Sequence, residues 1–269
     1  MTDLPQYEIF AIRYAKQDLR AESHIFLGGD PNKMIHGLDF FTYAIRGNGK
    51  TWVVDTGFTP AKAERMGRKY DYLIRPSAAL AKIGIDAASA TDVILTHAHF
   101  DHVGTMDDYP NAMFHIQDVE MVHVTGRDMT HPRFRAAYHP EDVKDLIDLV
   151  YADRMTFHEG DTTIAPGLEF ILIGGHARGQ AILRVHTQRG WVILASDAVH
   201  VFEEVDEGRP FAVFYDLFTM MEGYRRIDKL AGSRDLIVPG HDYRVTAAYP
   251  PAAPGSEGEI MRLDLPPRW

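Results

Sequence analysis

One segment, Thr96-His97-Ala98-His99-Phe100-Asp101-His102-Val103-Gly104, places four potential metal ligands within six residues. It follows the short apolar run 93–95, which is typical of a buried strand. Residues two apart in an extended segment face the same way, so we expect His97, His99 and Asp101 to converge. His102 then turns toward a second point as the chain leaves the strand. Imidazole and carboxylate groups bind zinc and related divalent ions, so the segment predicts two neighbouring metal sites.

Three later residues of ligand type share this context, because each directly follows a predicted strand. His176 follows residues 168–173, and Asp197 follows residues 191–195. His241 follows the last predicted strand in Pro239-Gly240-His241-Asp242. Ligands from several strand ends can meet at one edge of a pair of packed sheets, so we expect these residues to complete the site.

Composition narrows the class of protein. The chain has 269 residues, a formal net charge of −10 and no cysteine. Disulfides, iron–sulfur clusters and thiolate zinc sites are therefore excluded. The negative charge disfavours a nucleic-acid partner, which needs clustered Lys and Arg. We find no signal peptide and no run of about 18 apolar residues, so we expect a cytoplasmic protein without a membrane partner.

Periodicity predicts one α/β domain over residues 1–269, with a proline-rich extended tail at about 250–269. Strands and then helices occur twice along the chain, which favours two packed sheets with helices outside. The predicted strands are residues 7–14, 40–45, 51–54, 93–95, 168–173, 181–186, 191–195 and 236–238. The predicted helices are residues 60–70, 77–83, 140–151 and 218–230.

The full pattern resembles the metallo-β-lactamase superfamily, whose motif is His-x-His-x-Asp-His followed by a distant His, Asp and His. All seven positions are matched, by His97, His99, Asp101, His102, His176, Asp197 and His241. Val54-Asp55-Thr56-Gly57 also matches an early turn of that family. The resemblance implies an αββα sandwich with a dinuclear centre. Carried over by position, His97, His99 and His176 hold one metal, Asp101, His102 and His241 hold the other, and Asp197 bridges.

Within the superfamily, the chain is most similar to N-acyl-homoserine lactonases, which act in quorum quenching. The cues are Phe100 inside the motif, which we expect in the substrate pocket, and the segment Arg209-Pro210-Phe211-Ala212-Val213-Phe214. Two departures stand out. Those lactonases have Asp-x-x-Tyr where this chain has Asp197-Ala198-Val199-His200, and many relatives have His-Thr-Pro-Gly-His where it has His176-Ala177-Arg178-Gly179-Gln180.

These observations predict a metal-dependent hydrolase that opens a lactone by attack of a metal-bridging hydroxide on the carbonyl. Zinc is the default ion, although iron, manganese or cobalt suits the same ligands. The diiron oxygen-reducing branch has Glu at the position of His99, which favours hydrolysis over redox chemistry. Hydrolysis of a β-lactam, thioester or phosphodiester stays open, as do a non-hydrolytic metal-binding role and a homodimer.

Specific roles follow for a few residues. Asp101 is expected to ligate a metal and so to act in catalysis, and Asp55 to hydrogen-bond the ligand-bearing loops. His200 is either a hydrogen-bond donor to the substrate or part of the pocket wall, and the sequence leaves both open. The segments 28–40 and 126–139 are candidate pocket walls, with core packing as the alternative.

Overall fold

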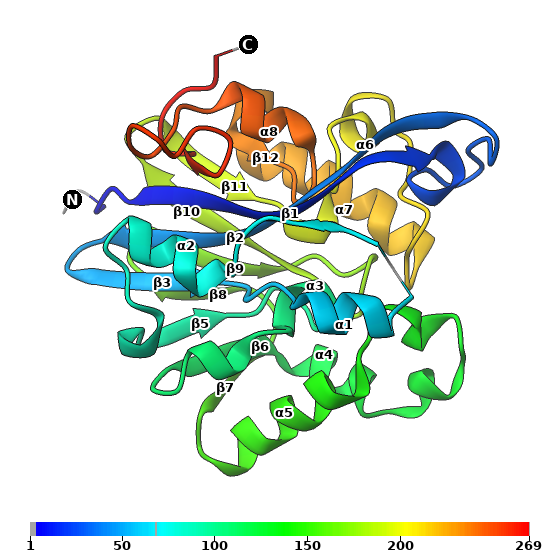
Figure 1. Ribbon diagram of the computed structural model, residues 1–269, viewed down its shortest axis with the longest axis horizontal. Coiled ribbons are helices and arrows are strands. Elements are labelled where there is room, and N and C mark those ends of the chain that lie inside the picture. The colour runs from blue at the N-terminus through cyan, green and yellow to red at the C-terminus, as the bar shows by residue number, and fades with distance from the viewer. Residues whose placement is uncertain (1–3, 68, 269) are drawn as a thin grey trace.

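The computed structural model describes residues 4–67 and 69–268, which form two mixed β-sheets stacked between helices (Figure 1). The first sheet has the order β13-β1-β2-β3-β5-β6-β7, with β4 paired to β1. Its strands are β1 (Glu8–Ala21), β2 (Met34–Gly47), β3 (Lys50–Val54), β4 (Asp71–Tyr72), β5 (Asp92–Ile94), β6 (Met113–Gln117), β7 (Met155–His158) and β13 (Ile260–Arg262).

The second sheet has the order β12-β11-β10-β9-β8. Its strands are β8 (Thr162–Ala165), β9 (Leu168–Leu172), β10 (Ala181–Thr187), β11 (Gly190–Leu194) and β12 (Ile237–Val238). The α-helices are α1 (Pro60–Arg65), α2 (Pro76–Lys82), α3 (Phe100–Val103), α4 (Asp118–Val124), α5 (Pro140–Tyr151), α6 (Glu203–Asp206), α7 (Leu217–Ala231) and α8 (Tyr243–Ala248). Among the described residues, no helix has the length and apolar character needed to cross a membrane.

Alternation along the strands divides the apolar core into layers. In β1, Ile9 and Ala11 face the second sheet, where they pack in one cluster with Phe170 and Leu183. The intervening Phe10 and Ile12 face the other way, in a cluster that contains residues of α2 and α5. On the far side of the second sheet, α7 packs its own apolar face against the strands. The order helix–sheet–sheet–helix confirms the predicted αββα sandwich.

Local signals set the bounds of several helices. Proline occupies the first turn of α1, α2 and α5, where its missing N–H costs no helical hydrogen bond. The Asp216 side chain accepts a hydrogen bond from the Thr219 N–H and so caps α7, and Gly232 follows the last helical residue in the left-handed conformation. These signals are why the predicted helix 140–151 is confirmed to the residue and the predicted helix 218–230 to within one.

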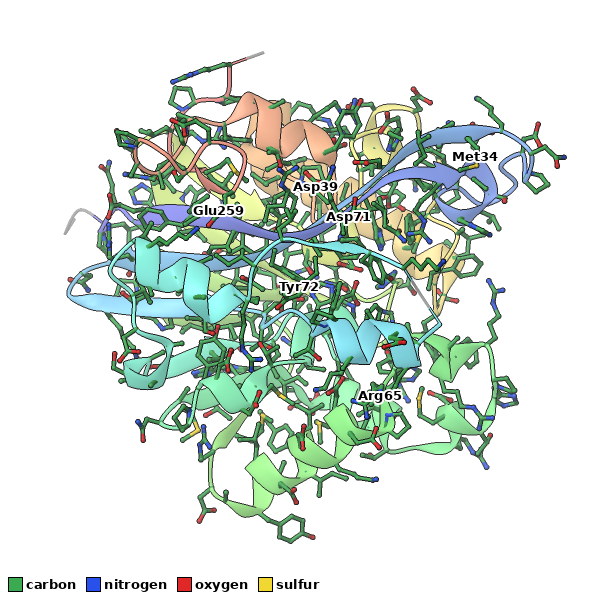
Figure 2. The ribbon with its side chains drawn as sticks, in the orientation of Figure 1. Met34, Asp39, Arg65, Asp71, Tyr72 and Glu259 are labelled. Atoms are coloured by element: carbon green, nitrogen blue, oxygen red, sulfur yellow. The ribbon has the colours of Figure 1, made fainter. Side chains whose placement is uncertain are left out.

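Other elements differ from the predictions. β1 and β2 continue well past the predicted strands and form a long hairpin whose outer part leaves the body of the molecule, with Met34 toward its free end and Asp39 nearer the core (Figure 2). Polar residues such as Lys16 and Gln17 carry no strand signal there; pairing with β2 holds them. β4, β6, β7, β8 and β13 were not predicted.

The proline-rich segment after residue 250 is not the extended tail that we expected. β13 pairs antiparallel with β1, and the segment buries Met261, Leu263 and Asp264. The Asp264 carboxylate accepts a hydrogen bond from the Ile9 N–H at 3.1 Å. The proline-rich composition predicted a segment exposed to solvent. The free edge of β1 in the first sheet instead pairs with it.

Candidate metal centre

All seven predicted ligands meet at one edge of the sandwich, where strands of both sheets end. They fall into two clusters of mutually close donor atoms: His97, His99, His176 and Asp197, and then Asp101, His102 and His241. Every one of these side chains is buried. Burial of so many ionisable groups is costly unless they are paired or bind a cation, so the arrangement itself points to a metal centre.

Asp197 lies between the two clusters. Its Oδ1 is 3.1 Å from Nε2 of His102 and 3.0 Å from Nε2 of His241. Its Oδ2 is 3.3 Å from Nε2 of His176 and 3.9 Å from Nε2 of His97. Each oxygen of a single carboxylate therefore faces a different histidine set, which is the geometry that a bridging ligand requires.

Asp55 supports the centre from behind. Its carboxylate accepts hydrogen bonds from the Thr96 N–H and hydroxyl, both at 2.8 Å, and pairs with Nδ1 of His102 at 2.8 Å. Its positive φ of 59° aims the side chain under the strand end that precedes His97. Holding Nδ1 of His102 in this way turns Nε2 toward the site, the usual arrangement behind a metal-binding histidine.

Backbone carbonyls orient two further histidines. The Asp39 carbonyl accepts from Nδ1 of His241 at 2.8 Å, and the Val213 carbonyl accepts from Nδ1 of His176 at 2.9 Å. The loop before His176 needs Gly175, whose φ is 84° and where an added Cβ would lie 2.4 Å from the Cα of Met220. These contacts leave Nε2 of each ring facing the centre.

The donor set fits divalent metal ions. Nε2 of His97 and Nε2 of His102 are buried without a hydrogen-bond partner among the described residues. Burial, followed by the neighbouring imidazoles, lowers the pKa of His97 well below its ordinary value. Burial and then His200 lower the pKa of His176 to about 3. The rings of His97 and His176 are therefore neutral at physiological pH. Each presents a nitrogen lone pair, which is what a metal ion requires of a ligand.

Asp101 and Phe100 depart from the predicted alternation, because the chain enters the short helix α3 at Phe100. Successive side chains there rotate by about 100° instead of alternating. Asp101 thus points to the centre, with Oδ1 at 4.0 Å from Nε2 of His102. Phe100 is fully buried against the Phe58 ring and lines neither of the two cavities at the site, so its place in the substrate pocket stays a prediction.

His200 also faces the centre. Its Nε2 lies 3.1 Å from Oδ2 of Asp197, and its ring stacks on Phe211 at a centroid distance of 3.4 Å. Burial alone would lower the pKa of His200, but the charges of Asp197 and Glu204 outweigh burial and raise the pKa to about 9. Glu204 was not predicted; its Oε1 accepts from the N–H groups of His200 and Val201 at 2.6 and 2.9 Å.

Two cavities open onto the centre, and His99, Ala137, His176 and Val213 line both of them. The smaller, of about 60 Å³, contains Leu38 and Phe40 from β2 together with His200 and Phe211. The larger, of about 190 Å³, has walls of Phe134, Tyr138, Phe214 and Tyr215, and we call it the aromatic lobe. Both predicted wall segments therefore contribute to the cavities.

A buried carboxylate that the sequence analysis missed joins two ligand-bearing loops. Glu120 in α4 accepts hydrogen bonds from the Ala98 N–H at 3.0 Å and the Gly179 N–H at 2.7 Å. It also accepts from the Tyr138 hydroxyl at 3.2 Å. A glutamate in the first turn of a helix is ordinary in sequence, so only its complete burial reveals this role.

Comparison with known proteins agrees with this geometry. Residues 41–241 match the family model of the metallo-beta-lactamase superfamily. The match covers most of the chain, and the protein belongs to this superfamily. Membership supports a metal-dependent hydrolase.

Individual relatives are similar to this chain at low sequence identity. An N-acyl homoserine lactonase of Bacillus thuringiensis is 26% identical over 164 residues, which are 61% of this chain and 60% of that protein. The match thus spans less than two thirds of that relative's length. The crystal structure of a quorum-quenching N-acyl homoserine lactone lactonase superposes with a TM-score of 0.75 at 21% identity, covering 91% of this chain and 95% of the other. The dizinc quorum-quenching lactonase AidC, in complex with a product, superposes with a TM-score of 0.69 at 17% identity, covering 89% of each chain.

Proposed function

We propose that the protein hydrolyses a lactone at a dinuclear metal centre, with zinc as the expected ion. The observation that carries this proposal is Asp197, whose two carboxylate oxygens face two separate histidine sets beside an aromatic cavity. The similar lactonases act on N-acyl homoserine lactones, which supports a lactone as the substrate class. A bound divalent pair supplies Lewis acidity and a water nucleophile at neutral pH.

The chain's own residues hold and orient the reactants. The two clusters would hold the metals. The Asp55 carboxylate and the Asp39 backbone carbonyl hold Nδ1 of His102 and of His241, so that these rings keep their orientation. The cavities sit directly on His99 and His176, so a bound substrate lies against the centre. His200 lines the smaller cavity, and its Nε2 lies 3.1 Å from Oδ2 of Asp197. An N–H at this nitrogen would donate a hydrogen bond to the carbonyl or the leaving oxygen of a substrate held beside Asp197.

A substrate panel tests the proposal. Metal-analysed protein is assayed with N-acyl homoserine lactones, simple γ- and δ-lactones, a β-lactam, a thioester and a phosphodiester. We expect the highest kcat/KM on a lactone, with two metal equivalents per chain. Asp197→Asn serves as the inactive reference, since it replaces the carboxylate whose two oxygens face the two histidine sets. Faster turnover of another bond would replace the lactone assignment, and absence of turnover at full metal loading would point to a non-hydrolytic role.

A further inference from the structure

Arg133 stands out among the residues of the aromatic lobe. It lies on the exposed segment between residues 131 and 134, with its guanidinium carbon 5.5 Å from the centroid of the Phe214 ring. Among the described residues, no carboxylate lies within ion-pair distance of this guanidinium. A fixed positive charge therefore lines the cavity and has no acid to neutralise it.

The surroundings of Arg133 preserve that charge. None of the described residues that line the lobe is Asp or Glu. Asp128, an acid of the same loop, already pairs with Nδ1 of His123 at 2.9 Å and with Arg178 at 3.6 Å. In a chain with a net charge of −10, this lobe is a local site of attraction for an anion.

The lobe also reaches the reactive centre. His99 and His176 line the same cavity as Arg133, so one molecule inside can contact both ends. Between the two ends the walls are aromatic, with Phe134 and Tyr215 at a centroid distance of 5.4 Å. A matching substrate has a hydrolysable carbonyl at one end, an apolar middle and a negative group at the other.

We propose that the aromatic lobe selects substrates that carry a carboxylate on the side remote from the scissile carbonyl, and that Arg133 binds this carboxylate. The planar guanidinium offers paired N–H donors that match both carboxylate oxygens, and it can keep its contact with Phe214 while donating. This inference rests on the proposed hydrolysis of a lactone and adds the chemistry of the group attached to that lactone.

Matched substrates give the kinetic test. N-acyl lactones whose acyl chain ends in a carboxylate are compared with the same chain ending in a primary amide. We expect the metal-loaded protein to prefer the carboxylate by about tenfold or more in kcat/KM, as for a hydrogen-bonded charge. Arg133→Gln should abolish this ratio. Arg135→Gln, which removes an exposed arginine of the same segment that does not line the lobe, should preserve it.

Binding gives a readout that does not depend on lactone turnover. Calorimetry compares a series of linear dicarboxylates with the corresponding monocarboxylates on the metal-loaded protein. We expect one dicarboxylate length to bind about tenfold tighter than its monocarboxylate, and Arg133→Gln to remove the difference. Equal affinities for the two series would overturn the inference, as would a preference for neutral aromatic acyl groups. If lactones are not hydrolysed but the dicarboxylate preference holds, only the proposed reaction is wrong.

Discussion

The Glu120 carboxylate accepts the Gly179 N–H at 2.7 Å and so joins α4 to the loop that carries His176. Its other oxygen accepts the Ala98 N–H, between the predicted ligands His97 and His99. The contact is tight, because a Cβ on Gly179 would lie 2.4 Å from the Cβ of Glu120. One buried charge thus fixes the relative position of loops from the two different sheets.

Glu120→Gln should therefore destabilise the protein and loosen the centre. The amide keeps one acceptor oxygen and turns an NH2 group toward a backbone N–H, which leaves a buried donor unsatisfied at a cost of about 1–3 kcal/mol. We expect a lower free energy of unfolding together with weaker metal affinity, measured by denaturant titration and by competition with a chelator. Glu159→Gln, at an exposed position, is the control and should change neither. Unchanged metal affinity in Glu120→Gln would show that the carboxylate only stabilises the fold.

Asp101→Asn should impair turnover much more than folding. The side chain points to the centre, while its backbone carbonyl, which accepts from the Tyr14 hydroxyl at 2.7 Å, is unaffected by the substitution. We expect turnover to fall by about a hundredfold or more, which is the loss seen when a group that stabilises developing charge in the transition state is removed. The melting temperature should change little. Asp107→Asn, whose side chain is 81% exposed, is the matched control. Near-normal turnover in Asp101→Asn would remove Asp101 from the ligand set.

His200→Ala distinguishes a catalytic donor from a pocket wall. If Nε2 donates to the substrate, turnover should fall by about ten- to a thousandfold, as for a lost donor to a developing oxyanion. His200→Tyr should retain more activity than the alanine variant, because a phenol restores a donor. Steady-state kinetics and metal analysis are measured on the same preparations. If the alanine variant turns over substrate as fast as the parent at full metal loading, His200 is part of the pocket wall and not a hydrogen-bond donor to the substrate.

Glu22 makes stability depend on pH at the base of the hairpin loop. Hydrogen bonds from Arg209, the Asp30 N–H and Lys33 lower the pKa of this carboxylate from 4.5 to about 2. An acid with a lowered pKa stabilises the folded state above its unfolded pKa, and it loses that contribution as the pH falls through the folded pKa. The melting-temperature difference between the parent and Glu22→Gln should therefore be largest at neutral pH and shrink from about pH 4.5 toward pH 2.

The comparison with Glu22→Gln cancels the general effect of acid on the histidine centre, which both proteins share. Glu207→Gln is the control, because Glu207 approaches the same Arg209 at 3.8 Å but is largely exposed. It should show little difference from the parent at any pH. If the melting-temperature difference between the parent and Glu22→Gln stays constant with pH, the folded protein does not stabilise the ionised form of Glu22.

The helix Pro140–Tyr151 and most strands of the second sheet could be predicted, because their signals are local: an apolar period and a proline or glycine at the ends. The outer half of β1 could not, since its polar residues are held by pairing with β2. β13 escaped prediction for the same reason, because a free strand edge elsewhere in the chain recruits it. Pairing across long sequence distances leaves no local pattern to read.

The sequence by itself determined which residues have the chemistry to bind metal, because ligand type and spacing after a strand are local properties. Only the tertiary structure decided how those groups are oriented and supported. It buries Phe100 in the core and places Glu120 and Glu204 in hydrogen bonds with the loops around the centre. It also leaves Arg133 in the aromatic lobe without a carboxylate partner among the described residues. The physical reason is that burial and pairing are properties of the packed molecule: a carboxylate or guanidinium acquires its role from the atoms that surround it, and those atoms come from distant parts of the chain.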